Sequence, residues 1–191
     1  MNPPTVILIT GHPATGKTTL AKALTQELAL PLLYRDRLKE TLGDVLGWST
    51  DEWSRRLGSA TWKLLYDLVD MLLQAKVSHI VESNFDPNHD SPKWQVLYKR
   101  YSLHLIQLRC EAEPEIVLVR NRRRVETGQR HPIHHYDPDE HEYRQILEQG
   151  HIGWLDVPGE RISINTGNLR PSAYHTIAEQ LRQLLGNGDR E

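Results

Sequence analysis

The stretch Gly11-His12-Pro13-Ala14-Thr15-Gly16-Lys17-Thr18 decides the fold. It matches the pattern G-x-x-x-x-G-K-[ST], which forms a phosphate-binding loop between a β-strand and an α-helix. The flanking sequence fits, because a β-branched run from Thr5 to Thr10 precedes the loop and a helical apolar pattern begins at Lys17. Strand, glycine loop and helix in this order predict a P-loop, and a glycine turn that only opens a helix is the alternative.

The residue types of this loop suit a nucleoside triphosphate and its magnesium ion. Glycines let backbone N–H groups turn toward phosphate oxygens, and the helix that follows contributes its positive end. We expect Lys17 to reach the β and γ phosphates and Thr18 to bind Mg²⁺. The predicted nucleotide-binding residues here are Gly11, His12, Pro13, Ala14, Thr15, Gly16, Lys17, Thr18 and Thr19.

Strand-like and helix-like stretches alternate along the rest of the chain. Further strands are expected at 31–34, 79–81, 103–108 and 161–165. Helices are expected at 17–30, 37–42, 50–75, 91–101, 114–124 and 171–185. Because parallel strands need crossover helices, this order predicts an α/β fold with a mainly parallel five-stranded sheet and helices on both faces.

Three finer features belong to this expectation. Ser49-Thr50-Asp51-Glu52 fits a capping box at the start of the long helix, and Gly58 is a candidate break within it. The polar stretch at 125–153 has little apolar rhythm, which indicates a small mobile or capping lid. With 191 residues, the chain is expected to form one domain over residues 1–191.

Composition narrows the class of protein. A net charge of −2 gives no field of one sign that could gather nucleic acid or an anionic membrane, so any polyanion site must be local. Cys110 is the only cysteine, which excludes intramolecular disulfides and suits a reducing compartment. The first apolar run, Val6 to Ile9, is too short for a signal peptide or a membrane span. We expect a soluble cytoplasmic protein.

Asp36 follows the second expected strand, at the edge of the sheet where ligands bind. A carboxylate there could accept the proton of an attacking hydroxyl group. Its alternative role is to cap the helix that follows, and both roles could coexist. Asp156-Val157-Pro158-Gly159 resembles the D-x-x-G of GTPases but comes too late in the chain, and we interpret it as a turn.

The sequence resembles the polynucleotide-kinase-like branch of the P-loop kinases, an AAA-type ATP-binding group that includes zeta-toxin-like and antibiotic-phosphorylating kinases. Four segments in the right order carry the resemblance, which covers most of the chain. They are the P-loop, Arg35 to Lys39, Val81 to Pro87 and Arg120 to Arg124. The resemblance implies a three-layer P-loop NTPase fold and the use of ATP with Mg²⁺.

The same resemblance implies roles for residues beyond the P-loop. Asp36 would be the general base, and Lys39, where arginine is usual in the family, would contact the substrate. Glu82 stands where the family has aspartate near the magnesium-bound water, with a solvated strand-end acid as the alternative. Asn84 is a weaker candidate for the substrate site, and Thr166 lies in the loop near the nucleoside base.

Arg120 and Arg124 are four residues apart on one expected helix, so they share a face. Two guanidinium groups there could clamp nucleotide phosphates and stabilise the transition state, the same pair that the family pattern indicates. A solvated face and a nucleic-acid stripe are the alternatives. Arg130 is a candidate third charge of the lid that reaches the substrate.

Histidines gather in the suspected lid. With Asp137 and Glu142 nearby they could form a zinc or nickel site, although the spacing fits no common motif and we expect a solvent-facing lid. Partial protonation would make such a lid sensitive to pH. These histidines are His131, His134, His135, His141 and His151.

Together these patterns predict a kinase that moves the γ phosphate of ATP to a hydroxyl of a small molecule. From Arg35 to Asp70 there are six basic and seven acidic residues, fewer positive charges than a groove for a nucleic-acid backbone would need. A kinase for the 5′ hydroxyl of oligonucleotides or nucleosides is the second hypothesis. A non-catalytic NTP-binding sensor or adaptor is the third.

Overall fold

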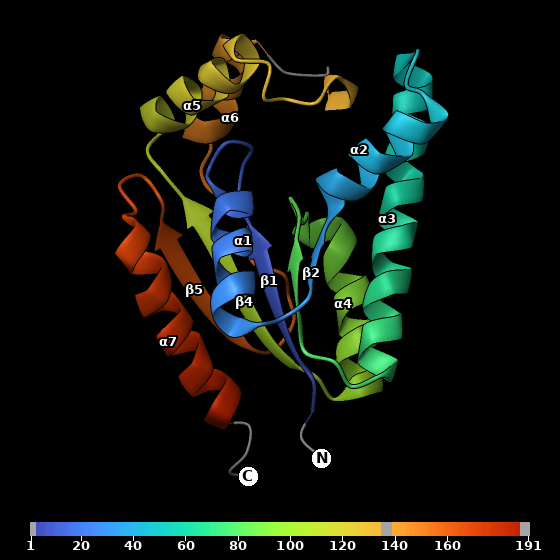
Figure 1. Cartoon of the computed structure of the whole chain (residues 1–191), viewed down its shortest axis with the longest axis vertical. Coiled ribbons are helices and arrows are strands. Elements are labelled where there is room, and N and C mark those ends of the chain that lie inside the picture. Colours follow the sequence, from blue (N-terminus) through green and yellow to red (C-terminus); the bar gives the residue numbers. More distant parts are fainter. Residues whose placement is uncertain (1–2, 135–138, 188–191) are drawn as a thin grey trace.

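The computed structural model of the chain describes residues 3–134 and 139–187. Its centre is a five-stranded parallel sheet in the order β2-β3-β1-β4-β5, with helices on both faces (Figure 1). The strands are β1 Thr5–Thr10, β2 Leu32–Tyr34, β3 His79–Glu82, β4 His104–Glu111 and β5 Glu160–Asn165. The predicted three-layer α/β fold is confirmed, and each described strand pair is parallel.

Helices connect the strands and cover the sheet. Those of the three layers are α1 Lys17–Leu28, α2 Arg35–Leu46, α3 Asp51–Gln74, α4 Pro87–Tyr101 and α7 Pro171–Asn187. Over the carboxyl ends of the strands lie α5 Pro114–Glu126, the short 3-10 helix η1 Pro132–His134 and α6 Glu140–Glu148 (Figure 1). None of the helices described is both long and apolar enough to cross a membrane.

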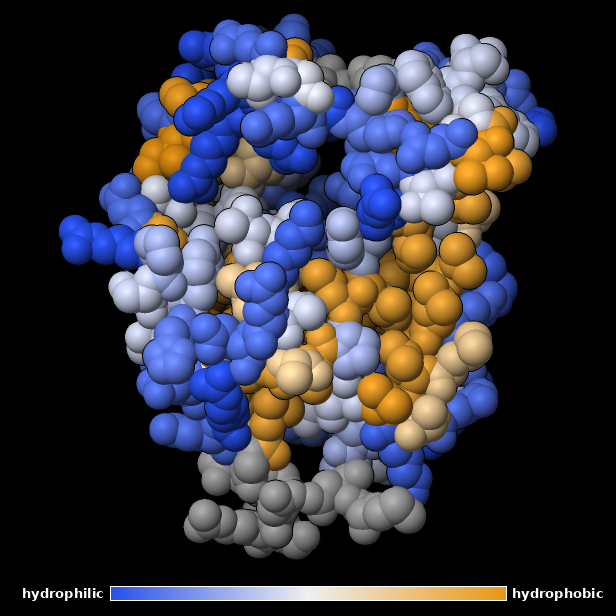
Figure 2. All heavy atoms as spheres, in the orientation of Figure 1, coloured by the Kyte–Doolittle hydropathy of each residue, from blue (hydrophilic) through white to orange (hydrophobic). Residues whose placement is uncertain are grey.

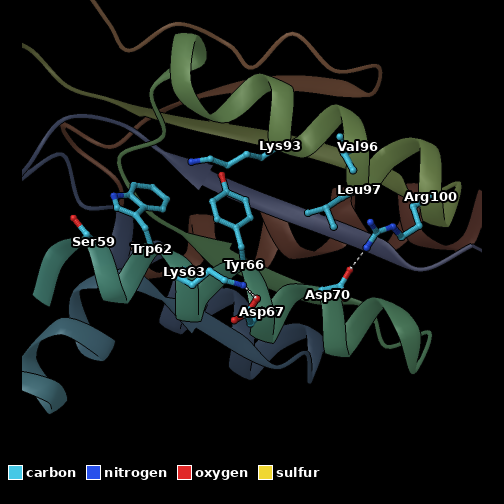
Figure 3. A pocket seen from close by; sticks show the side chains of 10 residues that line it. All are labelled: Ser59, Trp62, Lys63, Tyr66, Asp67, Asp70, Lys93, Val96, Leu97 and Arg100. Carbon is cyan, nitrogen blue, oxygen red and sulfur yellow. Dashed lines mark hydrogen bonds and ion pairs between the residues drawn. The ribbon is translucent and has the colours of Figure 1, made fainter. Parts of the chain in front are cut away.

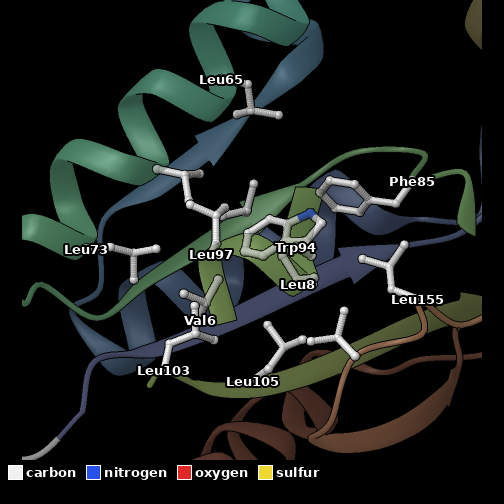
Figure 4. Packing of buried hydrophobic residues seen from close by; sticks show 13 residues of the cluster. Val6, Leu8, Leu65, Leu73, Phe85, Trp94, Leu97, Leu103, Leu105 and Leu155 are labelled. Carbon is white, nitrogen blue, oxygen red and sulfur yellow. The ribbon is translucent and has the colours of Figure 1, made fainter. Parts of the chain in front are cut away.

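The core follows from the alternation of side chains along β1. Val6 and Leu8 point to the layer of α3 and α4, where Trp94 and Phe85 pack (Figure 4). The neighbours of Val6 and Leu8 along the strand point to the opposite layer, which α1 and α7 cover. Both faces of the strand are therefore buried, which explains its unbroken apolar sequence.

Strand register sets the position of the site. Glu82 at the end of β3 lies opposite Tyr34 of β2 on one side and opposite Ile9 of β1 on the other. Three strands thus end at one level, and the chain turns there into the P-loop, into Arg35 and into the loop after Glu82. The P-loop, the start of α2 and the loop after β3 therefore lie together at one edge of the sheet.

Two details of the long helix differ from the sequence-based expectation. α3 runs without a break through Gly58, which is buried and lies beside the guanidinium of Arg35. The cap is Thr50 rather than Ser49, and its side chain accepts a 3.1 Å hydrogen bond from the backbone N–H of Trp53. The sequence therefore predicted a capped helix start correctly, but the capping residue is one position later than expected.

The described part of the segment at 125–153 contains more secondary structure than its polar sequence suggests. Among the residues described, it forms η1 and α6, and α6 buries Tyr143 and Leu147 against the P-loop and α5. It is therefore a capping element that packs on the rest of the molecule, and Figure 2 shows a hollow in the surface below it. Of the two expectations for this segment, a mobile lid and a capping one, the packing of α6 agrees with the capping one.

Candidate active site

The P-loop needs glycine where β1 ends. A Cβ atom at Gly11, whose φ is +145°, would lie 2.5 Å from the carbonyl oxygen of Cys110 and 2.8 Å from Oγ1 of Thr15. Backbone of β4 thus closes on the start of the loop, and a side chain cannot fit between them. Gly16, also with positive φ, then leads the chain into the first turn of α1.

Lys17 is buried inside this loop. Its ammonium donates a 2.9 Å hydrogen bond to the carbonyl oxygen of His12, so the side chain curls back over the loop. Burial lowers the pKa of Lys17, and the carboxylates of Glu82 and Asp36 oppose that shift. The lysine is thus held at the centre of the loop, with two negative charges nearby.

Thr18 and Glu82 form a polar pair across the strand ends. Thr18 Oγ1 donates to Oε2 of Glu82 at 2.9 Å, and Glu82 is only 3% exposed. Burial raises the pKa of Glu82, whereas the charge of Lys17 lowers it. A hydroxyl and a carboxylate are the oxygen ligands that Mg²⁺ prefers, and few protein ligands suffice when phosphates and water complete the shell. The donor set therefore fits the predicted ion.

Asp36 lies in the first turn of α2, directly after β2. The N-cap position is Tyr34 and no side chain caps this helix, so the alternative role of Asp36 as a cap is wrong. Its carboxylate is about half exposed, and its charge acts on the pKa of Lys17, Glu82 and His134. The fold thus brings this carboxylate into the field of the P-loop.

The two arginines of α5, Arg120 and Arg124, have different surroundings. Arg124 is exposed on α5, and its charge acts on the pKa of both Lys17 and Glu82, so it lies within electrostatic range of the P-loop. Arg120 instead donates hydrogen bonds of 2.9 and 3.0 Å to the carbonyl oxygens of Thr166 and Gly167. In this conformation, Arg120 binds the loop after β5 and Arg124 adds charge beside the phosphate cradle.

Thr166 joins that loop to the P-loop. Its hydroxyl donates to the carbonyl oxygen of Thr15 at 2.5 Å, and its backbone N–H donates to the carbonyl oxygen of Glu111. Thr166 is buried, so its side chain has a bracing contact with the phosphate loop. The residue predicted to lie near the nucleoside base is thus in direct contact with the nucleotide-binding loop.

Sequence reasoning missed the contact between α6 and the P-loop. Tyr143 donates a 2.6 Å hydrogen bond from its hydroxyl to the carbonyl oxygen of Pro13, and His12 Nε2 lies 2.9 Å from the carbonyl oxygen of Gly150. Burial lowers the pKa of His12, which favours its neutral form. The signal was the four-residue spacing of Tyr143 and Leu147, the two buried residues of α6.

Lys39 and Arg130, both predicted to bind substrate, make contacts with η1. Lys39 Nζ lies 3.0 Å from Ser54 Oγ and 3.5 Å from the carbonyl oxygen of Ile133. Arg130 Nε donates to the carbonyl oxygen of His134 at 3.1 Å. The other candidate, Asn84, is exposed just beyond β3 at the same edge of the sheet.

Two of the lid histidines pair with acids of α2. His131 Nε2 lies 3.0 Å from Oδ1 of Asp44, and His134 Nε2 lies 3.3 Å from Oε1 of Glu40. Within residues 3–134 and 139–187, no three metal-binding side chains gather at one point. His135 and Asp137 lie outside the described residues, so the metal hypothesis has no support from the part that is described.

A groove of about 580 Å³ lies between α3 and α4 (Figure 3). Its lining includes Trp62, Tyr66 and Lys93, and Lys93 lies over the ring of Tyr66. The tryptophan at the end of the groove also contacts Arg35, the neighbour of Asp36. The groove therefore adjoins the site without including the P-loop.

Fold and site together define a P-loop nucleotide-binding protein with the three-layer architecture of the P-loop kinases. Residues 6–148 match the model of the AAA domain family, and the chain belongs to that family. The match includes the P-loop, Asp36, Glu82 and both arginines of α5. None of the curated proteins matches the sequence.

Solved structures agree with this assignment. A putative kinase from Chloroflexus aurantiacus is 38% identical, with 94% of this chain and 97% of that chain covered and a TM-score of 0.86. A sugar kinase from Janibacter sp. is 17% identical, with 98% of each chain covered and a TM-score of 0.56. The APS kinase CysC of Mycobacterium tuberculosis, in complex with AMPPNP and APS, is 13% identical, with 97% and 99% covered and a TM-score of 0.56. The last two show similarity of fold.

Proposed function

We propose that the protein is an ATP-dependent kinase that transfers the γ phosphate to a hydroxyl group of a small molecule, with Asp36 as general base. The observation that carries this proposal is that Lys17, Glu82 and Asp36 stand at the ends of the neighbouring strands β1, β3 and β2, at the edge of the sheet over which α5 with Arg124 lies. Each of the other three charges acts on the pKa of Lys17. A phosphate cradle and a carboxylate that can accept a proton are the two parts that phosphoryl transfer to an alcohol needs.

Each residue has a role that follows from its contacts. Backbone N–H groups of the P-loop and the ammonium of Lys17 hold the phosphates, and Arg124 offsets charge that develops on the transferred group. Asp36, half exposed at the start of α2, takes the proton of the acceptor hydroxyl. Thr18 and Glu82 would hold Mg²⁺, directly or through water, and the ion would neutralise charge on the β and γ phosphates.

Related structures support a kinase in general. The relative at 38% identity is described as a putative kinase, and the structures of similar fold include a sugar kinase and an APS kinase with AMPPNP, an ATP analogue. These comparisons favour a small-molecule acceptor over a nucleic acid. The lone buried Cys110 supports a reducing, cytoplasmic setting as part of the same proposal.

The replacement of Asp36 tests the proposal. Asp36→Asn keeps the size of the side chain but removes the base, so Mg-ATP should bind as in the wild type. Phosphotransfer should fall by about 100- to 10,000-fold. Binding is measured by calorimetry and turnover by ADP release across a panel of hydroxyl compounds, oligonucleotides included. Lys17→Ala should weaken both binding and turnover.

Asp67→Asn is the matched control, because Asp67 is about as exposed as Asp36 and lies on α3. The rate of ADP release by this variant should equal that of the wild type. Unchanged phosphotransfer in Asp36→Asn would remove Asp36 as the base. Nucleotide binding without phosphotransfer to any compound would instead favour a sensor that uses NTP binding to engage a partner.

A further inference from the structure

The guanidinium of Arg35 is largely enclosed, and its Nε has no hydrogen-bond acceptor among the described residues. Its side chain is 21% exposed and stacks on the ring of Trp62, with Cζ 4.8 Å from the ring centre. The closest carboxylate oxygen is Oδ1 of Asp36 at 3.7 Å, which is too far for a hydrogen bond. Nε is enclosed, and nothing in the described part of the chain accepts a hydrogen bond from it.

This arrangement is costly, because a buried donor that gives up water and gains no acceptor is destabilising. Burial lowers the pKa of Arg35, in line with that cost. An arginine that served stability alone would direct its five donors to a carboxylate or to carbonyl oxygens. Trp62 fixes the guanidinium in place, since its own ring packs on Phe85 and Tyr66.

The other cations around this point are already engaged. Lys39 contacts Ser54 Oγ and the carbonyl oxygen of Ile133. Lys93 pairs with Asp90 at 3.3 Å. Its ammonium also lies over the ring of Tyr66 (Figure 3). Of these three cations, Arg35 is the one for which the described residues provide no hydrogen-bond acceptor.

The carboxylates around Arg35 do not accept hydrogen bonds from its guanidinium. Asp90 attracts Arg35 through space, but its oxygens accept from the Tyr66 hydroxyl at 2.8 Å and from the backbone N–H of Asp86 at 2.9 Å. Glu40, one turn along α2, lies 3.3 Å from His134. Asp36 remains, half exposed and beyond hydrogen-bond distance.

Gly58 leaves space beside this guanidinium. A Cβ atom built there would have one neighbour within 4 Å outside its own helix, Nη2 of Arg35 at 3.5 Å. Glycine is unfavourable in the middle of a helix such as α3, so its presence requires a reason. Any longer side chain at 58 would press on the guanidinium, and the small residue keeps that side of Arg35 open.

We propose that Arg35 binds an oxyanion of the acceptor, so that the substrate is a small hydroxyl compound that carries a carboxylate, sulfate or phosphate group. The planar guanidinium binds such groups through two parallel hydrogen bonds. Because Arg35 and Asp36 are adjacent, the same molecule presents its anion to Arg35 and its hydroxyl to Asp36, a few bonds apart. This inference rests on the proposed kinase function and names its substrate class.

Matched pairs of acceptors test the charge preference. Three pairs are glycerate with glycerol, gluconate with glucitol, and a nucleoside 3′-phosphate with the nucleoside. The charged member of at least one pair should have the higher kcat/KM, and the pair identifies the source of the oxyanion. In Arg35→Gln, KM for that compound should rise about 10- to 100-fold, while kcat changes less than threefold. Arg35→Lys keeps the charge but loses the paired N–H donors of the guanidinium, so its KM should lie between those of the wild type and Arg35→Gln.

Arg37→Gln is the control, since Arg37 lies two residues along α2, is exposed and gives the same change in net charge. Its KM should stay within twofold of the wild type. Thermal melting of each variant checks that it folds. Equal kcat/KM for both members of all pairs, with no effect of Arg35→Gln on KM, would overturn the inference and leave the kinase proposal intact.

A binding measurement does not depend on turnover. Arginine side-chain N–H signals are followed by NMR while acetate or sulfate is added to the protein loaded with Mg-ADP, which occupies the P-loop. The Arg35 signal, assigned from its absence in Arg35→Gln, should shift and saturate. Saturation without phosphotransfer to any compound would support the anion site and contradict the kinase. An Arg35 signal that does not move with either anion or with the charged acceptors would overturn the anion site.

Discussion

Thr18 Oγ1 donates a 2.9 Å hydrogen bond to Oε2 of Glu82 and so joins the first turn of α1 to the end of β3. These two residues are 64 positions apart in the chain and meet because β1 and β3 are parallel neighbours. The pair offers two oxygen atoms beside the ammonium of Lys17. A buried acid with a raised pKa is costly to the fold, which is typical of a functional position.

Glu82→Gln should weaken magnesium binding. The substitution keeps the shape of the side chain but removes the negative charge that attracts the ion. The Mg²⁺ concentration for half-maximal turnover should rise about 10- to 100-fold, whether the carboxylate contacts the ion or a water bound to it. A magnesium titration at saturating ATP measures this. Glu52→Gln, on the exposed start of α3, serves as control, and an unchanged titration for Glu82→Gln would exclude a metal role.

Tyr143→Phe tests whether α6 supports the P-loop. The substitution keeps the ring buried but removes the 2.6 Å hydrogen bond to the carbonyl oxygen of Pro13. The free energy of unfolding should fall by about 0.5 to 1.5 kcal/mol, as expected for one hydrogen bond. The Kd for Mg-ATP should rise a few-fold, because the loop loses a brace.

Ile146→Ala is the matched control for that prediction, since Ile146 lies on the same helix and is 39% exposed. Calorimetry with Mg-ATP and urea unfolding are run on both variants. A loss of stability in Tyr143→Phe with no change in the Kd for Mg-ATP would mean that α6 packs on the P-loop without helping it to bind nucleotide.

Local patterns predicted most of the fold. The P-loop and its flanking strand and helix depend on residues close in sequence, so Gly11, Gly16 and Lys17 were sufficient to place them. Each expected strand exists, because apolar runs between helical patterns are a local signal. The end of β4 at Glu111 was missed, since its last residues alternate with polar ones.

Contacts between distant segments were not predictable in this way. The sequence of the lid is polar, and nothing local shows that Tyr143 reaches Pro13, 130 residues away. Lys39 was predicted to bind substrate from its place after Asp36, but its bond to Ser54 depends on how α2 packs on α3. No role was predicted for Arg35 itself, because its stack on Trp62 exists only in the folded chain.

Cys110 should resist thiol reagents in the native protein. Its side chain is buried at 2% exposure, and burial raises the pKa of its thiol to about 12. Since the thiolate is the reactive form, both access and ionisation oppose reaction. A chromogenic disulfide reagent should label less than a tenth of the native protein in an hour and all of it in urea. Rapid labelling of the native protein would show that β4 opens beside the P-loop.

His79 should make the fold sensitive to acid. It is fully buried in β3, its Nδ1 lies 2.8 Å from the carbonyl oxygen of Val77, and its Nε2 has no partner among the described residues. Burial lowers the pKa of His79 below the ordinary value of 6.5, so the fold requires the neutral ring. The unfolded chain takes up the proton more readily, and the stability present above pH 6.5 is lost as the pH falls below it.

His79→Leu should therefore remove part of that pH dependence. Urea unfolding at pH 7.5, 6.5 and 5.5 gives the free energy of unfolding of each variant. The wild type should lose stability toward pH 5.5 by up to about 1.4 kcal/mol more per pH unit than His79→Leu, the limit for one proton. His12 and His134, whose pKa values burial also lowers, contribute equally to both proteins and cancel in the difference. His89→Gln, at an exposed position on α4, is the control, and its free energy of unfolding should change with pH as that of the wild type does. If the free energy of unfolding of His79→Leu changes with pH as steeply as that of the wild type, the buried ring accepts a proton without cost.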